Sequence, residues 1–316
     1  MGFRVRDENS VKDPMNRLLC FGLGYSAEHF VRTFGTAFDH VVGTVRDAGR
    51  VADLSAKDGR LSAMAFDGKN VSRELRDAAA QADAVLVSVP PDENGDPVLR
   101  LLAETLASGA NLQSIVYLST VGVYGDCGGA WIDEATQPEP DTARSRERLA
   151  AEQAWQEIGE RRGIPVAVLR LAGIYGPGQN ALLQVASGNA RRIVKPGQVF
   201  NRIHVADIAR AIDAAFTRRA SGIFNVADDE PTPSGEPIAF AAQLLGVAPP
   251  PEVRFEEVAP TMSPMALSFW QECRRVNNDR LKRVLGVSLL YPTYREGLRA
   301  LLANAEPRPL SAGLAL

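Results

Sequence analysis

The 316-residue sequence is poor in the residues that build metal sites and disulfide frameworks. It has three cysteines and three histidines. The cysteines, Cys20, Cys127 and Cys273, are odd in number, lie far apart and show no CxxC spacing. They give neither a disulfide framework nor a set of metal ligands, and they fit a reducing compartment. We therefore expect a cytoplasmic protein without a bound metal.

The sequence also has no large excess of charge of one sign. The chain has 35 basic and 38 acidic residues, a net charge of -3, and no basic run or aromatic-basic stripe. Nothing here calls for a nucleic-acid partner, so a small-molecule partner is expected. The first 14 residues carry charges throughout and contain no apolar run. They predict a disordered tail at 1–14, before Met15 as a second candidate start, and no signal peptide or membrane span.

Short apolar runs alternate with amphipathic segments from Arg17 onward. Six runs predict strands: "RLLCFGLG", "HVVGTVR", "LSAMAF", "ADAVLVSVP", "SIVYLST" and "PVAVLRLAGIYG". Helical spacing follows in "YSAEHFVRTF" and, between the last four strands, in "VSRELRDAAAQ", "PVLRLLAETLASG" and "ARSRERLAAEQAWQEIGERRG". Near-continuous Val, Ile and Leu runs suit strands covered on both faces, so the pattern predicts an α/β fold with a doubly wound parallel (Rossmann) sheet.

The regular alternation of strand-like and helical segments ends after Tyr175. A loop and helix excursion is followed by "RIHVADIARAIDAAFTRRA", a helix, and "GIFNVADD", a short strand; the rest is mostly helical and broken by prolines. We predict a dinucleotide-binding domain from residues 15–176 and 201–226. A smaller, mostly helical C-terminal substrate lobe is predicted from 177–200 and 227–316. A substrate should bind in the crevice between this lobe and the strand ends.

The first turn after a strand carries a dinucleotide fingerprint. In "FGLGYSA", Gly22, Gly24 and Ala27 form GxGxxA between the first strand and the first helix. The first glycine permits a tight turn, the second lets the backbone approach a pyrophosphate, and the small third residue lets helix and strand pack closely. The phosphates would meet the helix N-terminus. A plain glycine turn is the alternative.

The second strand ends where the ribose of a dinucleotide should lie, about twenty residues on. Arg46 occupies that place, with Asp47 beside it and Arg50 close behind. An arginine there suits a 2'-phosphate, so NADP is favoured as cofactor, whereas Asp47 leaves NAD open. Arg46 as a solvated loop residue is the alternative. Asp67 is a candidate for contacting the adenine, or else an acidic turn residue.

Several motifs in order give the chain a family resemblance. They are "STVGVYGD" (119–126), "LRLAGIYGPG", "RIHVADIARAI", "GIFNVADDEPT", and "NNDRLKRVLG" followed by "YPTYREGL". From about Arg17 to Leu302 the sequence resembles the extended and atypical short-chain dehydrogenase/reductases, the NAD-dependent epimerase/dehydratase group.

The resemblance implies roles for individual residues. Thr120 matches the catalytic Ser or Thr that hydrogen-bonds the substrate oxygen, with a buried strand threonine as the alternative. Tyr124 is a second catalytic candidate, although such tyrosines more often shape the pocket. His204 and Asp207 match a structural strand-to-helix corner.

The proton-transfer residues of that family are replaced. The resemblance implies a PxxxYxxSK pattern, in which the tyrosine is the acid or base and the lysine holds the cofactor ribose. Counting from Pro140 places Arg144 at the tyrosine, Glu147 at the serine and Arg148 at the lysine. Arg148 can still donate to ribose hydroxyls, but the guanidinium of Arg144 cannot act as acid or base. Other nearby candidates for the proton are Thr120, Tyr124, Asp126 and Glu134.

Two further interpretations of these arginines stay open. Both could lie on a solvated helix face, salt-linked to Glu147 and Glu152. Arg144 could instead bind a substrate anion, together with a basic group downstream: Arg191, Arg192 and Lys195.

Two functions follow as expectations. The first is an NADP-binding oxidoreductase of the epimerase type that transfers hydride between the nicotinamide and a small sugar-derived or anionic metabolite. The second is a dinucleotide-binding sensor or scaffold without turnover, favoured by the missing tyrosine. A homodimer through the helix at 144–161 is what the resemblance suggests.

Overall fold

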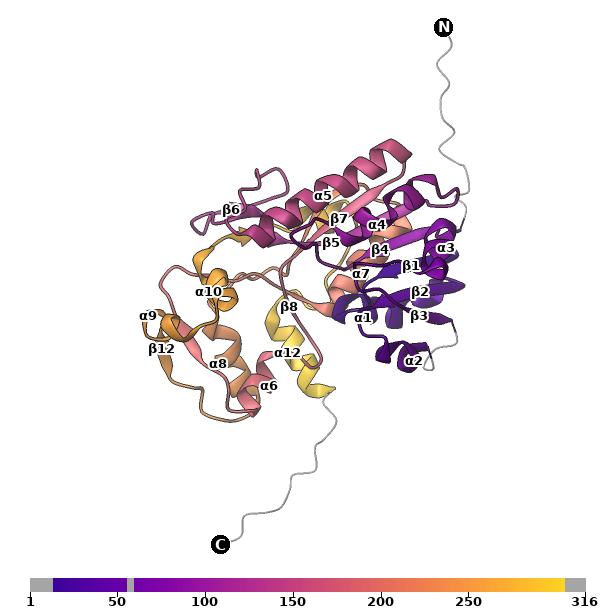
Figure 1. Cartoon of the computed structure of the whole chain (residues 1–316). Coiled ribbons are helices and arrows are strands. Elements are labelled where there is room, and N and C mark those ends of the chain that lie inside the picture. The colour runs from indigo at the N-terminus through magenta and orange to yellow at the C-terminus, as the bar shows by residue number, and fades with distance from the viewer. Residues whose placement is uncertain (1–13, 56–59, 305–316) are drawn as a thin grey trace, which may run out of the picture.

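A seven-stranded parallel sheet forms the centre of the molecule (Figure 1). The computed structural model describes residues 14–55 and 60–304, so the predicted tail lies outside the described residues except for Pro14. The strand order is β11-β7-β5-β4-β1-β2-β3. In that order the strands are Gly222–Val226, Val166–Leu171, Ser114–Thr120, Ala84–Val87, Arg17–Phe21, His40–Val45 and Leu61–Ala65. The predicted doubly wound parallel sheet is confirmed.

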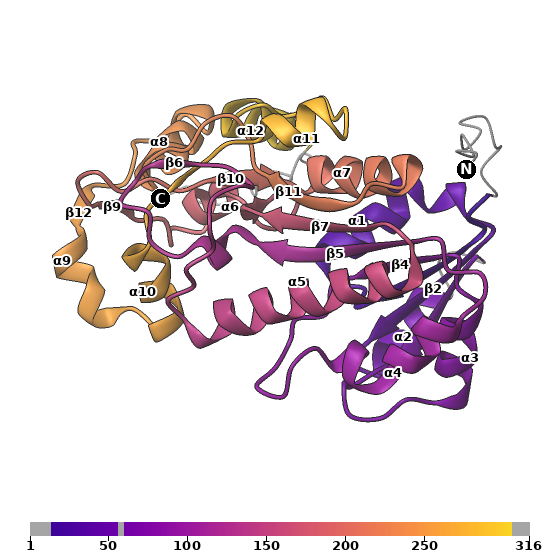
Figure 2. The ribbon, with the colours of Figure 1, turned by 90° about the horizontal axis from the view of Figure 1, so that it is seen from above.

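Alternate residues of each strand enter two separate apolar clusters. In β1, Leu18 and Cys20 pack on one face of the sheet, and Leu19 and Phe21 pack on the other. The first face is covered by helices α1 (Tyr25–Phe34) and α7 (Val205–Arg218). The second is covered by α3 (Arg73–Gln81), α4 (Pro97–Ser108) and α5 (Ala143–Arg162), as Figure 2 shows. Burial on both faces explains why the strands are apolar throughout.

Smaller elements gather beside the carboxyl ends of the strands (Figure 1). The helices there are α6 (Ala181–Ala186), α8 (Gly235–Leu244), α9 (Phe255–Val258), α10 (Pro264–Gln271) and α12 (Tyr294–Ala303). Three two-stranded pairs accompany them: β8 (Gly173–Tyr175) with β10 (Arg202–His204), β9 (Arg192–Val194) with β12 (Glu252–Arg254), and β6 (Trp131–Ile132) with β13 (Arg275–Val276). Strands of two or three residues are too short to show a period, so the sequence did not predict these pairs as such.

One late segment packs on the sheet rather than among these elements. Leu281, in helix α11 (Asp279–Arg283), and the following Leu285 and Val287 belong to the same apolar cluster as Phe224 of β11. The segment lies in the range predicted for the smaller lobe (227–316), because apolar spacing in a sequence does not say which core a segment joins. The predicted domain boundaries stay a prediction.

A buried ion pair joins α5 to the sheet. Glu152 of α5 binds Arg170 of β7, with Oε2 and Nη2 2.7 Å apart, and both side chains are almost fully buried. Ser119 of β5 donates its hydroxyl hydrogen to the same carboxylate. On the other side, the guanidinium of Arg170 lies 4.6 Å from the centre of the Tyr124 ring. The pair therefore ties together α5, two central strands and the turn after β5.

Removing the charge of Glu152 should destabilise the fold strongly. In Glu152→Gln, Arg170 stays buried without a counter-charge, which costs about 3–5 kcal/mol of unfolding free energy. Urea denaturation of the two proteins measures this change. The matched control is Arg73→Gln, which breaks an exposed ion pair with Asp77 and should change the unfolding free energy by less than about 1 kcal/mol. Equal effects of the two substitutions would contradict the interpretation.

Candidate functional site

Two hollows lie along the carboxyl ends of the strands. One, of about 410 Å³, is lined by the glycine turn after β1 and by the end of β2. The other, of about 500 Å³, is lined by the end of β5 and by the start of α5. Ser88, just after β4, lines both. The strand order reverses between β1 and β4, which is where ligands of doubly wound sheets bind.

The backbone of the glycine turn is fixed by close packing. Gly22 has a φ of +89°, and a Cβ there would lie 2.9 Å from Cγ2 of Val89. The amide of Gly22 donates to the hydroxyl of Thr44 on β2 at 2.8 Å. Thr44 was not predicted; the only signal in the sequence is a hydroxyl within a buried strand, two residues before Arg46. Gly22 is therefore required for the turn itself.

Gly24 leaves open space beside the start of α1. It is the N-cap residue of α1, and no side chain caps that helix end. A Cβ built on Gly24 would have no atom of the protein within 4 Å, so it would project into open space. Ala27, one turn later, is fully buried against the sheet. Free amides and the positive end of a ten-residue helix thus face a space that fits a pyrophosphate.

The predicted NADP residue lies at the same hollow. Arg46 and Arg50 line it, and both are exposed. Arg50 also lies 3.6 Å from Glu28, in a partly exposed ion pair. The carboxylate of Asp47 accepts a hydrogen bond from the amide of Gly49 at 2.8 Å, at the start of helix α2 (Gly49–Ser55). Asp47 is thus engaged with its own turn, while two guanidinium groups border the hollow.

Asp67 fits both of its predicted interpretations. It lines the hollow beside Phe66. Its Oδ1 accepts hydrogen bonds from the amides of Lys69 at 2.8 Å and Asn70 at 3.0 Å, and these bonds lower the pKa of the carboxyl. Asp67 therefore organises the turn after β3 and at the same time presents a carboxylate to the hollow.

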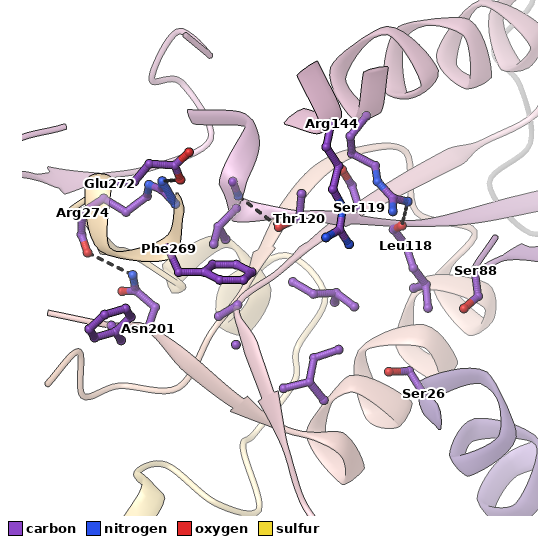
Figure 3. Close-up of a pocket in the computed structure, with 18 of the residues that line it drawn as sticks. Ser26, Ser88, Leu118, Ser119, Thr120, Arg144, Asn201, Phe269, Glu272 and Arg274 are labelled. Carbon is purple, nitrogen blue, oxygen red and sulfur yellow. Dashed lines mark hydrogen bonds and ion pairs between the residues drawn. The ribbon is translucent and has the colours of Figure 1, made fainter. Parts of the chain in front are cut away.

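Two hydroxyl groups lie at the end of β5 (Figure 3), and they differ in the hydrogen-bonding capacity that they leave free. Oγ1 of Thr120 accepts a hydrogen bond from the amide of Gly122 at 3.1 Å, which leaves its hydroxyl hydrogen available to the second hollow. Ser119 donates its own hydrogen to Glu152, which leaves oxygen lone pairs available. Thr120 was predicted, and Ser119, its neighbour in "STVGVYGD", was missed.

Tyr124 does not reach this hollow. It is 1% exposed, and its hydroxyl donates to Oδ1 of Asn225 at 2.8 Å. Burial raises the pKa of its hydroxyl. Its ring packs under Arg170, so the geometry gives no support to the prediction that it is catalytic.

The two acidic candidates for the proton, Asp126 and Glu134, bond to other parts of the chain. Asp126 accepts the amide of Cys273 at 2.7 Å. Glu134 accepts the amide of Asn225 at 2.7 Å. Neither lines the second hollow. Among the four proton candidates, Thr120 alone borders it.

Arg148, which the resemblance places at the family's lysine, is a fixed hydrogen-bond donor in the structure. It lines the second hollow and is nearly buried. Its Nη1 donates to the carbonyl of Leu118 at 3.0 Å and to the hydroxyl of Tyr117 at 3.2 Å. Both hydrogen-bond partners are neutral, so neither of them balances the positive charge of the guanidinium.

Arg144 lines the same hollow from the first turn of α5 (Figure 3). Its Nη1 lies 4.0 Å from the sulfur of Met265. The predicted salt link of this helix face to Glu152 is wrong, because Glu152 binds Arg170 instead.

The predicted anion-binding group around Arg144 is also not assembled. Arg192 pairs with Glu252 at 2.8 Å, and Lys195 donates to the carbonyl of Trp270. Neither they nor Arg191 line the hollow that Arg144 borders. A different arginine, Arg274, lines it; this residue was missed, and it pairs with Glu272.

His204 and Asp207 form the predicted structural corner. Nδ1 of His204 accepts the amide of Ala206 at 3.1 Å and so caps α7. Burial lowers its pKa to about 4. Asp207 accepts the amides of Leu290 at 2.6 Å and Tyr291 at 3.1 Å. His204 therefore caps the helix within its own turn, and Asp207 holds the start of that helix to a later loop.

Comparison with known proteins settles the family. Residues 66–227 match the NAD dependent epimerase/dehydratase family. The chain belongs to this family. Within residues 14–55 and 60–304, no group of three or more His, Cys, Asp or Glu side chains could hold a metal ion. The same residues include no helix that is long and apolar enough to cross a membrane.

Three relatives show how far the similarity extends. A functionally unknown conserved protein of Silicibacter pomeroyi is 43% identical, with a TM-score of 0.82, over 92% of this chain and 99% of that one. A 3-diazoavenalumate denitrifying reductase of a Streptomyces species is 32% identical over 138 residues, which are 42% of this chain and 45% of that protein. The chain thus matches less than half of that reductase. The dTDP-glucose 4,6-dehydratase of Bacillus anthracis, solved in complex with NAD, shares the fold with a TM-score of 0.72 at 17% identity over 91% of this chain and 96% of that one.

The two glycines of the turn should respond differently to substitution. Gly24→Val should leave the thermal unfolding midpoint nearly unchanged, because the new side chain meets open space. It should weaken NADPH binding at least tenfold, because the side chain fills the space proposed for the pyrophosphate. Gly22→Val should lower the midpoint itself, because of the positive φ and the clash with Val89. Calorimetric titration and thermal denaturation check both; unchanged NADPH affinity in Gly24→Val would contradict the assignment.

Proposed function

We propose that this chain is an NADP-dependent oxidoreductase acting on a small metabolite. The observation that carries the proposal is the arrangement of the two hollows, which share Ser88 and lead from the glycine turn to Thr120. An extended dinucleotide would fit along such a path, with its adenosine part at Arg46 and its reactive end near β5. This is where ligands of doubly wound folds bind.

The chain supplies distinct groups for each part of the cofactor. The turn at Gly22 and Gly24, with the N-terminus of α1, would hold the pyrophosphate. Arg46 and Arg50 would bind the 2'-phosphate through charge-assisted hydrogen bonds. Arg148 would place its positive charge beside the ribose of the nicotinamide. When bound, the nicotinamide supplies or accepts a hydride.

The remaining chemistry rests on the protein's own hydroxyls. Thr120 would donate its hydrogen to an oxygen of the substrate and stabilise negative charge that develops there. Ser119 would accept a hydrogen bond from a neighbouring group of the substrate. Reduction is the proposed direction, because one relative is named a reductase, although the match covers less than half of that protein.

A sensor or scaffold that binds NADP without turnover is the second candidate. It is favoured by the resemblance, which implies that Arg144 stands where the family has its acid; Arg144 lines the second hollow. NADPH oxidation over a panel of carbonyl compounds separates the two candidates. Firm NADPH binding with no oxidation of any compound would favour the sensor.

Arg46 should determine the choice between the two nicotinamide cofactors. In Arg46→Asp, the charge-assisted bonds to the 2'-phosphate are lost, and each is worth about 1.5–3 kcal/mol. The affinity for NADPH relative to NADH should therefore fall at least tenfold, measured by calorimetric titration of both. Arg73→Asp, the same charge change on an exposed part of α3, should leave that ratio unchanged. A ratio unaffected by Arg46→Asp would overturn the NADP assignment.

Thr120 should matter for turnover and not for cofactor binding. Thr120→Val keeps the shape of the side chain and removes the donor, so kcat/KM for reduction should fall by about 10²-fold or more. The NADPH dissociation constant should stay within about twofold. Thr120→Ser, which restores the hydroxyl, should recover most of the rate. Full activity in Thr120→Val would exclude this role for the hydroxyl.

A further inference from the structure

We infer that the substrate carries a carboxylate group and that Arg144 binds it. This inference rests on the proposed function and deepens it, because it concerns the same hollow. It assigns to the family's tyrosine position a role in recognition in place of proton transfer.

The charges that line the second hollow are unbalanced. They are three arginines and one glutamate: Arg144, Arg148, Arg274 and Glu272. Glu272 pairs with Arg274. Arg148 donates to a carbonyl and to a phenol hydroxyl, and the proposed function uses it for the cofactor. Within the described part of the chain, Arg144 forms no ion pair, so its charge is available to a ligand.

The placement of Arg144 is unfavourable for the helix that carries it. Helix α5 has 20 residues, and its first turn contains no acidic residue. A positive side chain at the positive end of a helix lowers stability by about 0.3–1 kcal/mol, whereas Arg161 and Arg162 in the last turn suit the dipole. Helix stability therefore does not explain Arg144. Its guanidinium and the helix end together make a positive potential, which favours an anion at the hollow.

The number and shape of the available donors favour a carboxylate. A single guanidinium offers two parallel N–H groups, the arrangement that a carboxylate accepts in a bidentate manner. A nucleoside diphosphate carries at least two negative charges. The single positive charge of Arg144 would not balance both of them. Thr120 lines the same hollow as Arg144 (Figure 3), and it would then bind a second oxygen of the same small molecule.

Apolar side chains of α10 lie at the second hollow and beside Arg144. Phe269 lines the hollow and is 58% exposed, and Met265, which contacts Arg144, is 61% exposed. Exposed large apolar side chains at the rim of a pocket suit an apolar part of a ligand. We therefore expect the carboxylate to belong to a molecule with an apolar or aromatic body.

Matched acids and esters test the inference. Pyruvate, benzoate and phenylpyruvate, each beside its neutral methyl ester, are titrated into the full chain with and without NADPH, by calorimetry. Inorganic phosphate is titrated in the same way. The proteins are the native chain, Arg144→Gln, and the control Arg161→Gln, which removes an exposed arginine from the far end of the same helix.

The expected result is that at least one acid binds ten or more times more tightly than its ester. Arg144→Gln should abolish this preference, and Arg161→Gln should keep it. Equal binding of acids and esters, no binding of any acid, or a preference that survives Arg144→Gln would overturn the inference. Phosphate binding that depends on Arg144, in the absence of acid binding, would also overturn it, in favour of a phosphoryl group. Failure of NADPH to bind overturns the proposed function separately, since the titrations without NADPH still report on Arg144.

Discussion

The buried pair of Glu152 and Arg170 is the interaction on which the site depends. Helix α5 brings Arg144 and Arg148 to the second hollow, and this ion pair holds α5 on the strands that supply the rest of the site. The same carboxylate takes the hydroxyl hydrogen of Ser119, and the same guanidinium supports the Tyr124 ring. A charged pair in an apolar interior is costly unless both partners are satisfied. The pair adds directional bonds to the apolar packing of Ala151, Trp155 and Ile158 of α5 on the second face of the sheet.

Much of the fold could be predicted from the sequence, because the signals are local. Strands buried on both faces must be apolar throughout, and the glycine turn needs Gly22 for its backbone and Gly24 for its open side. Short pairs such as β6 with β13 could not be predicted, since two residues define no period. The packing of Leu281, Leu285 and Val287 on the sheet was missed because apolar spacing does not identify the core that a segment joins.

The sequence predicted the lining residues that lie in a motif at the end of a strand. It did not predict those that come from distant segments of the chain. Thr120, Arg144 and Arg148 line one hollow, and Arg46 and Asp67 line the other. Arg274 comes from the far end of the chain, and only the tertiary fold brings it to the turn at Gly125. A strand-end motif does not say which side chains turn inward, so the catalytic role of Tyr124 stays a prediction; Asn225 and Arg170 contact its hydroxyl and its ring in the interior.

An arginine at position 144 narrows the chemistry that this site could perform. A guanidinium stabilises negative charge but does not release a proton near neutral pH. Hydride addition to a substrate would therefore have to be completed by a proton from solvent or through the hydroxyl of Thr120, or else yield a product that needs no proton at that position. Binding of the substrate by its carboxylate would also fix the position of its reacting carbon without a tyrosine. A bidentate ion pair defines both the distance between carboxylate and guanidinium and the plane in which they lie. In the proposed function, this version of the site would therefore provide recognition and orientation of the substrate in place of acid catalysis.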